Sequence, residues 1–247
     1  MEPHRWNHEA GFGQTAVDTV KEMPTVVTQR LGSVLTMKTR EVCRSCNNGW
    51  MSQLERQVKP LVLSLMDAAV RGWSIGILPD EAARLSTWAV KTAWMQALSA
   101  GTTVGHSDSY HYLRQRLLPP PDCKVWLGRH AGELDFNIKQ MAVQVRRSDR
   151  PWDDGDIRNV LWTCLTFRSL SFLVYTVDGW GVPPPTRDSN RWRPVWPQSM
   201  SIRFPARFDV SDQDVLSAVA LQAPALHTPD LPVFERDPDG TQYRRRN

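Results

Sequence analysis

The sequence predicts an α+β fold, and three features of its residue pattern predict it. Between residues 50 and 69, and again between 85 and 98, apolar residues recur every three or four positions, which is the spacing of a helix with one buried face. After residue 124 the pattern changes to alternating or β-branched runs that are typical of strands. Helices followed by a run of strands favour a helical pair packed on a mostly antiparallel sheet.

The length and composition are those of a globular chain. Its 247 residues, 41% hydrophobic and 23% charged, suffice for one large domain or two small ones. The net charge of +4 is compatible with a nucleic-acid partner. No stretch has the roughly 18 consecutive apolar residues of a membrane helix, so we expect no membrane partner. The pattern of a secretory signal peptide is missing and four cysteines do not suggest a disulfide scaffold, so we expect a reduced, cytoplasmic protein.

The chain divides into four predicted parts. Residues 1–24 are polar and broken by glycine and proline, which indicates a loop. Residues 25–101 hold a β-hairpin between Thr25 and Val42, a cysteine-containing turn and the helical pair. Residues 102–222 form a β-rich domain packed with the helices. Residues 223–247 are rich in proline and charge, and we expect them to be disordered.

Both helices of the pair carry sequence signals at their ends. The first begins near Trp50 and ends at Gly72, and Pro60 inside it predicts a kink or a division into two helices. The second starts after Pro79, where Asp80 and the glutamate beside it favour the first turn. Between this helix and the strands, His106 and His111 flank a stretch rich in serine and aspartate that predicts a loop.

The second half is predicted to be mostly strands. Residues 159–176 are almost all apolar, aromatic or β-branched, so they form either one buried helix or a hairpin that turns at Arg168-Ser169, and the residue types favour the hairpin. The alternation from Leu134 to Val145 slips once, which suggests a β-bulge. Further strands are expected at Lys124–Arg129 and Ser199–Phe204, and a last helix at Asp212–Ala220, begun by Ser211 or Asp212.

Cys43 and Cys46 are the most informative residues of the chain. Two cysteines separated by two residues can place both sulfurs on one zinc ion, but a closed structural site needs four ligands. The alternative is a pair of reduced cysteines in a tight turn. Cys123 and Cys164 stand alone in apolar stretches and are expected to be buried thiols.

The run VCRSCNNGWMSQLE, from Val42 to Glu55, resembles the signature of a group of HNH-endonuclease-like, treble-clef proteins of bacteria and their phages. Similar features follow at Trp88–Ala93 (Trp-Ala-x-Lys-Thr-Ala), Pro119–Leu127 and Trp196-Pro197. The resemblance covers residues 25 to about 220, and its specific part is the CNNGWMS core. It implies hydrolysis of phosphodiester bonds in DNA, with a structural Zn²⁺ and a catalytic Mg²⁺ or Mn²⁺.

The resemblance also implies roles for individual residues. Such families carry an earlier cysteine pair and an acidic-His element, whose histidine activates water. In this sequence no cysteine precedes Cys43, and the histidines upstream of it are His4 and His8. The resemblance thus implies that His8 is the general base and that Asn47 helps to hold the catalytic metal. The residues alone leave another role open for Asn47, namely to satisfy turn amides and cap the next helix.

Two functions follow from this comparison. If the site is completed by His4, His8 or another chain, the protein is a metal-dependent nuclease. Alternatively, the chain begins after the family's first cysteine pair and is a catalytically inactive remnant that binds DNA or a protein partner.

Basic residues bracket the cysteine pair. On one face they would form a patch that follows the phosphates of DNA, and solvated surface charge is the equal alternative. These residues are Arg40, Arg44, Arg56 and Lys59.

Overall fold

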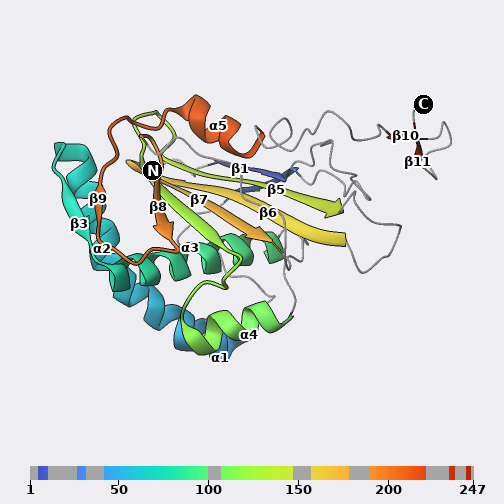
Figure 1. The fold of residues 1–247 in the computed structure, drawn as a ribbon, viewed down its shortest axis with the longest axis horizontal. Helices are drawn as coiled ribbons and strands as arrows, with labels where there is room; N and C mark the ends of the chain where they lie inside the picture. The colour runs from blue at the N-terminus through green and yellow to red at the C-terminus, as the bar shows by residue number, and fades with distance from the viewer. Residues whose placement is uncertain are drawn as a thin grey trace.

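A seven-stranded sheet forms the centre of the computed structural model, and helices lie on both of its faces (Figure 1). The structure describes residues 5–10, 27–31, 42–99, 107–146, 157–177, 190–220, 234–236 and 243–245. The strands lie in the order β2-β1-β5-β6-β7-β4-β8, and every neighbouring pair is antiparallel except β1 with β5. The predicted α+β fold with a mostly antiparallel sheet is therefore confirmed.

The elements have the following bounds. The strands of the large sheet are β1 (Arg5–Ala10), β2 (Val27–Leu31), β4 (Lys124–Arg129), β5 (Phe136–Arg146), β6 (Ile157–Phe167), β7 (Leu170–Val177) and β8 (Arg193–Trp196). Two small sheets pair β3 (Ile75–Ile77) with β9 (Ile202–Phe204) and β10 (Phe234–Arg236) with β11 (Tyr243–Arg245). The helical segments are α1 (Arg44–Cys46), η2 (Asn47–Met51), α2 (Ser52–Arg71), α3 (Pro79–Ser99), α4 (Ser107–Arg116) and α5 (Asp212–Ala220). None of those in the described part of the chain combines the length and apolar character of a membrane span.

Helix α2 follows its apolar stripe and runs unbroken through Pro60, so the predicted division into two helices is wrong. Pro60 lies on the exposed side of the helix, where water can satisfy the backbone carbonyl that proline leaves without a donor. The helix ends as predicted at Gly72, whose left-handed backbone (φ 71°) lets its N–H bond to the carbonyl of Ala68.

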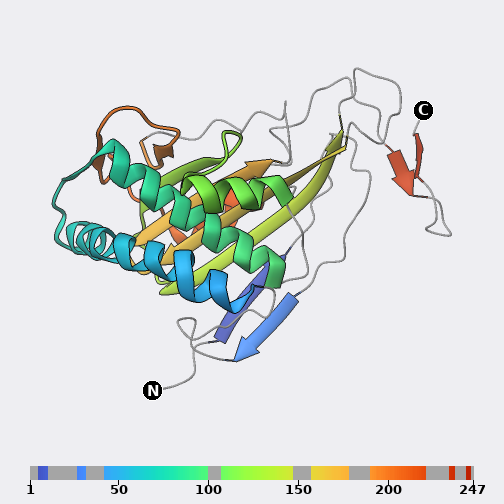
Figure 2. The same ribbon diagram turned by 90° about the horizontal axis from the view of Figure 1, so that it is seen from below.

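The central strands of the large sheet are buried on both faces. On one face, β4 to β7 pack against α2 and α3 in what we name the helix-side core; Figure 2 shows these two helices crossing the strands. On the other face, α5 covers a second cluster, which we name the α5-side core and which contains Trp162, Tyr175 and Val215. The described side chains of these central strands alternate between the two cores, because successive residues of a strand point to opposite faces.

This two-sided burial explains the slip in the pattern of β5. The register of β5 against β6 is continuous from Phe136 to Arg146, so the predicted bulge is wrong. Ile138 belongs to the helix-side core and Met141 to the α5-side core. Gln140 lies between these two residues in the sequence and is 2% exposed. Its Nε2 donates to the carbonyl of Ala93 and to Thr163 Oγ1, both at 2.8 Å. At this point the apolar residues of β5 move from the helix-side face to the α5-side face, and no residue is inserted in the strand.

The predicted hairpin of residues 159–176 is confirmed. Strands β6 and β7 pair in continuous register and turn at Arg168-Ser169, where Arg168 has a φ of 52°. Most residues of these strands are apolar, and their buried apolar side chains lie in the helix-side core under α2 and α3 or in the α5-side core.

The other elements that differ from the predicted structure lie in polar segments of the sequence. Arg5–Ala10 form strand β1 inside the segment expected to be a loop, and β2, expected to pair within a hairpin of residues 25–42, pairs with β1. Residues 32–41 lie outside the described part. The serine- and aspartate-rich stretch is helix α4, held by Leu113 in the helix-side core and by Tyr110, whose ring lies 4.7 Å from that of Trp94. In the tail expected to be disordered, β10 pairs with β11.

Helix α5 is fastened to the sheet by a buried histidine. The side chain of His130, at the end of β4, is fully buried, and its Nε2 lies 2.7 Å from Asp212 Oδ1 in the first turn of α5. His130 Nδ1 lies 2.7 Å from the carbonyl of Arg168. Both ring nitrogens of this buried histidine therefore have a hydrogen-bonding partner, one in the β6–β7 turn and one in α5.

The carboxylate of Asp212 has further partners. The backbone N–H of Glu133 donates to it at 2.9 Å and that of Leu134 at 3.3 Å. Burial opposes ionisation, but the N–H of Glu133, the His130 ring and the N–H of Leu134 outweigh it and lower the pKa of Asp212. The ion pair Arg129–Asp209 lies just before α5, and Arg191–Asp214 involves its first turn, so these polar contacts add to the packing of Val215 in the α5-side core.

Replacing Asp212 should loosen this fastening. We expect Asp212→Asn to lower the free energy of unfolding by about 2 kcal/mol at pH 7, because hydrogen bonds to a charged group are lost. A lowered pKa stabilises the fold above the unfolded value of about 3.9 and loses this effect as the pH falls through the folded value. Urea unfolding between pH 7 and pH 3 should therefore show the variant and the wild type converging in acid. Asp67→Asn, which breaks an exposed pair with Arg71, is the control and should cost about 0.5 kcal/mol or less. Equal losses in both variants would contradict the proposed fastening.

Candidate functional site

Cys43 and Cys46 open a helical turn that leads directly into α2. Cys43 is extended (φ −60°, ψ 147°) and caps α1, since its Sγ accepts the backbone N–H of Cys46 at 3.3 Å. The hydroxyl of Ser45 lies 3.2 Å from the same sulfur. The turn then widens through η2, where Gly49 leaves the helical conformation. Both cysteines therefore sit on one turn at the start of the helical layer.

Asn47 does not cap the helix, so that alternative is wrong. Its backbone is already helical and its N–H donates to the carbonyl of Cys43 at 3.0 Å, while its own carbonyl accepts from Ser52. The cap is Cys43, because the helical turn begins four residues earlier than Asn47 would place it. The side chain of Asn47 is exposed beside the cysteines.

The two thiols differ in acidity. The hydrogen bond from the Cys46 thiol, aided by Ser45, the Cys46 N–H and the Arg114 guanidinium, lowers the pKa of Cys43 to about 7. The same hydrogen bond and partial burial raise the pKa of Cys46, against the opposing effects of Arg114 and Trp50. At pH 7 the Cys43 thiol is therefore about half ionised, and Cys46 stays a thiol that donates a hydrogen bond to it.

Cationic side chains lie on this turn and further along α2. The Arg114 guanidinium, from α4, is among the charges that lower the pKa of Cys43. Of the basic residues singled out in the sequence, Arg44 lies between the cysteines and Arg56 and Lys59 lie on α2, and all three are exposed. Arg40 lies outside the described residues. The turn and the first half of α2 therefore carry exposed cations that can meet phosphate groups (Figure 1).

His8 lies on a different layer of the molecule. Its backbone is part of β1, paired with Thr28 of β2 and with Ile138 of β5. Figure 1 shows β1 in the sheet and α1 on the far side of the helical layer. Catalytic roles for His8 and Asn47 stay a prediction, as does zinc binding. Among the described residues, no group of three or more His, Cys, Asp or Glu side chains is placed to hold a metal ion, and Cys43 with Cys46 supplies two sulfurs.

A half-buried ion pair joins two parts of the sequence that carry the resemblance. Glu55, at the end of the VCRSCNNGWMSQLE run, accepts a 2.6 Å hydrogen bond from Lys91 Nζ in the Trp88–Ala93 run. The Lys91 side chain is 7% exposed and that of Glu55 is 54% exposed, so the lysine reaches from the core to the surface and ties the start of α2 to the middle of α3. The one sign of this pair in the sequence is a lysine inside the apolar pattern of α3.

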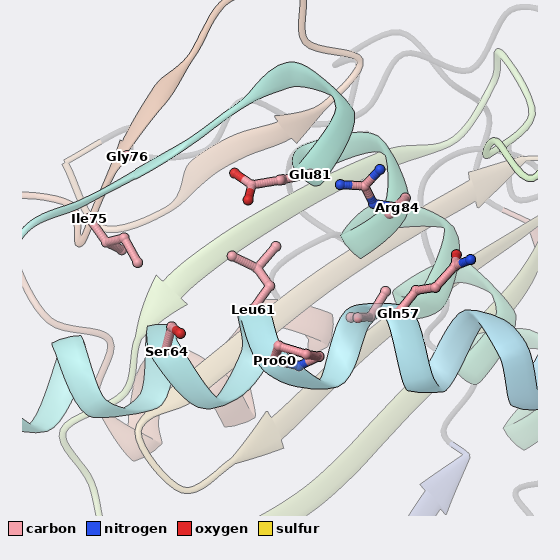
Figure 3. A pocket seen from close by; sticks show the side chains of 9 residues that line it. Gln57, Pro60, Leu61, Ser64, Ile75, Gly76, Glu81 and Arg84 are labelled. Carbon is pink, nitrogen blue, oxygen red and sulfur yellow. The ribbon is translucent and has the colours of Figure 1, made fainter.

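A small pocket lies further along α2. It has a volume of about 260 Å³ and lies between α2, β3 and the start of α3. Figure 3 shows Leu61 at its centre, with Gln57, Glu81 and Arg84 around it. Glu81 is engaged there, since its Oε2 accepts the N–H of Leu78 at 2.8 Å.

The other polar candidates have structural or undescribed positions. Cys123 and Cys164 are buried, as expected. His111 is exposed on α4, and His106 lies outside the described residues together with His4.

Comparison with known proteins finds no match among family models, curated proteins or solved structures. The function is therefore inferred from the residues and geometry of the chain itself.

The acidity of Cys43 can be tested through its neighbour. In metal-free protein, the rate of Cys43 alkylation by iodoacetamide should rise with pH around a midpoint of about 7. Cys46→Ala removes the largest cause of the lowered pKa, so the midpoint should move toward the ordinary value of about 8.5 and the rate at pH 7 should fall several-fold. Peptide mass spectrometry at Cys43 measures both the pH midpoint and the alkylation rate at pH 7. Asn48→Ala is the control and should leave the midpoint unchanged. An unchanged midpoint in Cys46→Ala would refute this origin of the acidity.

Proposed function

We propose that this chain is an HNH-endonuclease-like protein that binds zinc through Cys43 and Cys46 and binds DNA through the basic surface around them. The observation that carries the proposal is the shared turn of the two cysteines, with the Cys43 sulfur already accepting a backbone N–H. Backbone N–H groups that point at a cysteine sulfur stabilise the thiolate, which is the form that binds zinc.

The position of the pair also supports contact with a large ligand. Cys43, Arg44 and Asn47 are exposed, and their turn leads into the first turn of α2. The exposed Arg44 suits phosphate groups, because guanidinium binds phosphate through paired hydrogen bonds. Two further zinc ligands are required, and His4 or another chain are the proposed sources.

Hydrolysis of DNA is the proposed activity when the site is complete. In that case, Asn47 would help to hold Mg²⁺ or Mn²⁺, which would supply charge stabilisation at the phosphate, and His8 would be the base that activates water. A binding function without hydrolysis is the second candidate. The exposed cations favour it directly, since phosphate contact needs no catalytic histidine.

Zinc content tests the first part of the proposal. We expect one zinc per complete site in the purified full-length chain, and its loss in Cys43→Ser and in Cys46→Ser, measured by elemental analysis against protein concentration. Ser45→Ala alters the same turn without removing a ligand and should keep the metal. A wild-type protein without zinc would refute the metal site, and cleavage of plasmid DNA with Mg²⁺ or Mn²⁺ separates the nuclease from the binding protein.

DNA binding is tested by its dependence on salt. Arg44→Ala should weaken binding to duplex DNA several-fold and lower the slope of log K against log salt by about one, because one phosphate contact is lost. Fluorescence anisotropy at several salt concentrations gives both quantities. Arg203→Ala removes an equal charge from exposed β9, on another part of the molecule, and should leave the slope unchanged. If the two variants behave alike, the surface around Cys43 is not the DNA-binding surface.

A further inference from the structure

Cys43 and Cys46 have the spacing and geometry of a pair that can form a disulfide. Residues three apart on one helical turn have Cα atoms about 5 Å apart, inside the roughly 4.4–6.8 Å that a disulfide spans. The side chain of Cys43 is folded over this turn, since its sulfur lies 3.3 Å from the backbone nitrogen of Cys46. Closing an S–S bond therefore needs side-chain rotation and little movement of the backbone.

The two cysteines also differ in access. Cys43 is exposed, whereas Cys46 is half-buried behind it. A small molecule thus reaches the Cys43 sulfur first, and Cys46 is placed to react with Cys43 afterwards. The hydroxyl of Ser45, 3.2 Å from the Cys43 sulfur, is positioned to donate a hydrogen bond to a thiolate there.

We propose that Cys43 and Cys46 are a redox-active dithiol that reacts with small-molecule disulfides and closes an intramolecular disulfide. This further activity uses only the two cysteines and their turn. It requires neither zinc nor DNA and does not rest on the function proposed above.

The reaction balances in two exchange steps. The Cys43 thiolate attacks one sulfur of a disulfide RSSR, forming a mixed disulfide and releasing one thiolate RS⁻. The Cys46 sulfur then attacks Cys43 Sγ, which closes the Cys43–Cys46 bond and releases the second RS⁻. The two protons of the protein thiols end on the two released thiolates. The protein thereby loses two electrons, and RSSR is reduced to two RSH.

The remaining cysteines of the chain cannot take part. Cys123 and Cys164 are 1% and 0% exposed, so neither sulfur can be reached by a disulfide in the folded state. Oxidation is therefore confined to one pair. Zinc and the disulfide use the same two sulfurs, so each excludes the other.

The test uses the full-length chain after reduction, removal of metal by EDTA and removal of both reagents. The protein is equilibrated without oxygen in mixtures of reduced and oxidised glutathione, and exposed thiols are then trapped by alkylation. Intact mass and peptide mapping should show loss of both alkylation sites at Cys43 and Cys46 as oxidised glutathione increases, without bound glutathione. Excess dithiothreitol should restore both sites.

Two variants separate the steps. Cys46→Ser should accumulate a stable glutathione adduct on Cys43, whereas Cys43→Ser should form an adduct at least several-fold more slowly. Ser45→Ala should still close the disulfide, and far-UV circular dichroism checks that each variant is folded. Wild-type protein that keeps both thiols in excess oxidised glutathione, or keeps a glutathione adduct that Cys46 does not displace, would overturn the proposal. Because the assay contains neither metal nor DNA, its failure is distinct from a failure to bind zinc or DNA.

Discussion

The constraint on which the rest of the structure depends is that the central strands of the large sheet are buried on both faces. Strands β6 and β7 send alternate residues into the helix-side core and the α5-side core, and most residues of the two strands are apolar. Such a hairpin exposes a large apolar surface until both faces are covered, and apolar burial is the dominant favourable term in folding. Helices α2 and α3 cover one face, and the buried His130–Asp212 contact holds α5 over the other.

The candidate site is a consequence of how α2 is fixed on this sheet. Leu54, Val58 and Leu65 bury one side of α2, and Glu55 near its start is bonded to the buried Lys91 of α3. The turn leads into this fixed start of the helix, and it displays Cys43 to solvent while the hydrogen bonds of α1 fix its backbone.

Sequence patterns predicted the elements whose signals are local. Gly72 ended α2 through its own backbone freedom, and Ser211 starts α5 by accepting the N–H of Asp214. The patterns failed where the stabilising contact comes from elsewhere in the chain. Helix α4 is stabilised by the contact of Tyr110 with Trp94 of α3. Strand β1 is polar, and its place in the sheet is set by its pairing with β2 and β5. For the site, spacing identified Cys43 and Cys46, but Arg114 could not be found because it approaches from α4.

The unequal acidity of the two thiols links the two chemistries proposed for them. Zinc binding requires both sulfurs as thiolates, whereas at pH 7 Cys43 is about half ionised and the pKa of Cys46 is raised. Metal binding must therefore release the remaining protons, so zinc would compete best as the pH rises. Disulfide exchange needs a thiolate on the exposed sulfur at the start and a thiol beside it. The Cys43 thiolate with the Cys46 thiol beside it thus meets the requirement of exchange at a lower pH than the requirement of zinc binding. The ligands that complete the zinc site decide which chemistry prevails, since they must provide the energy that removes the second proton.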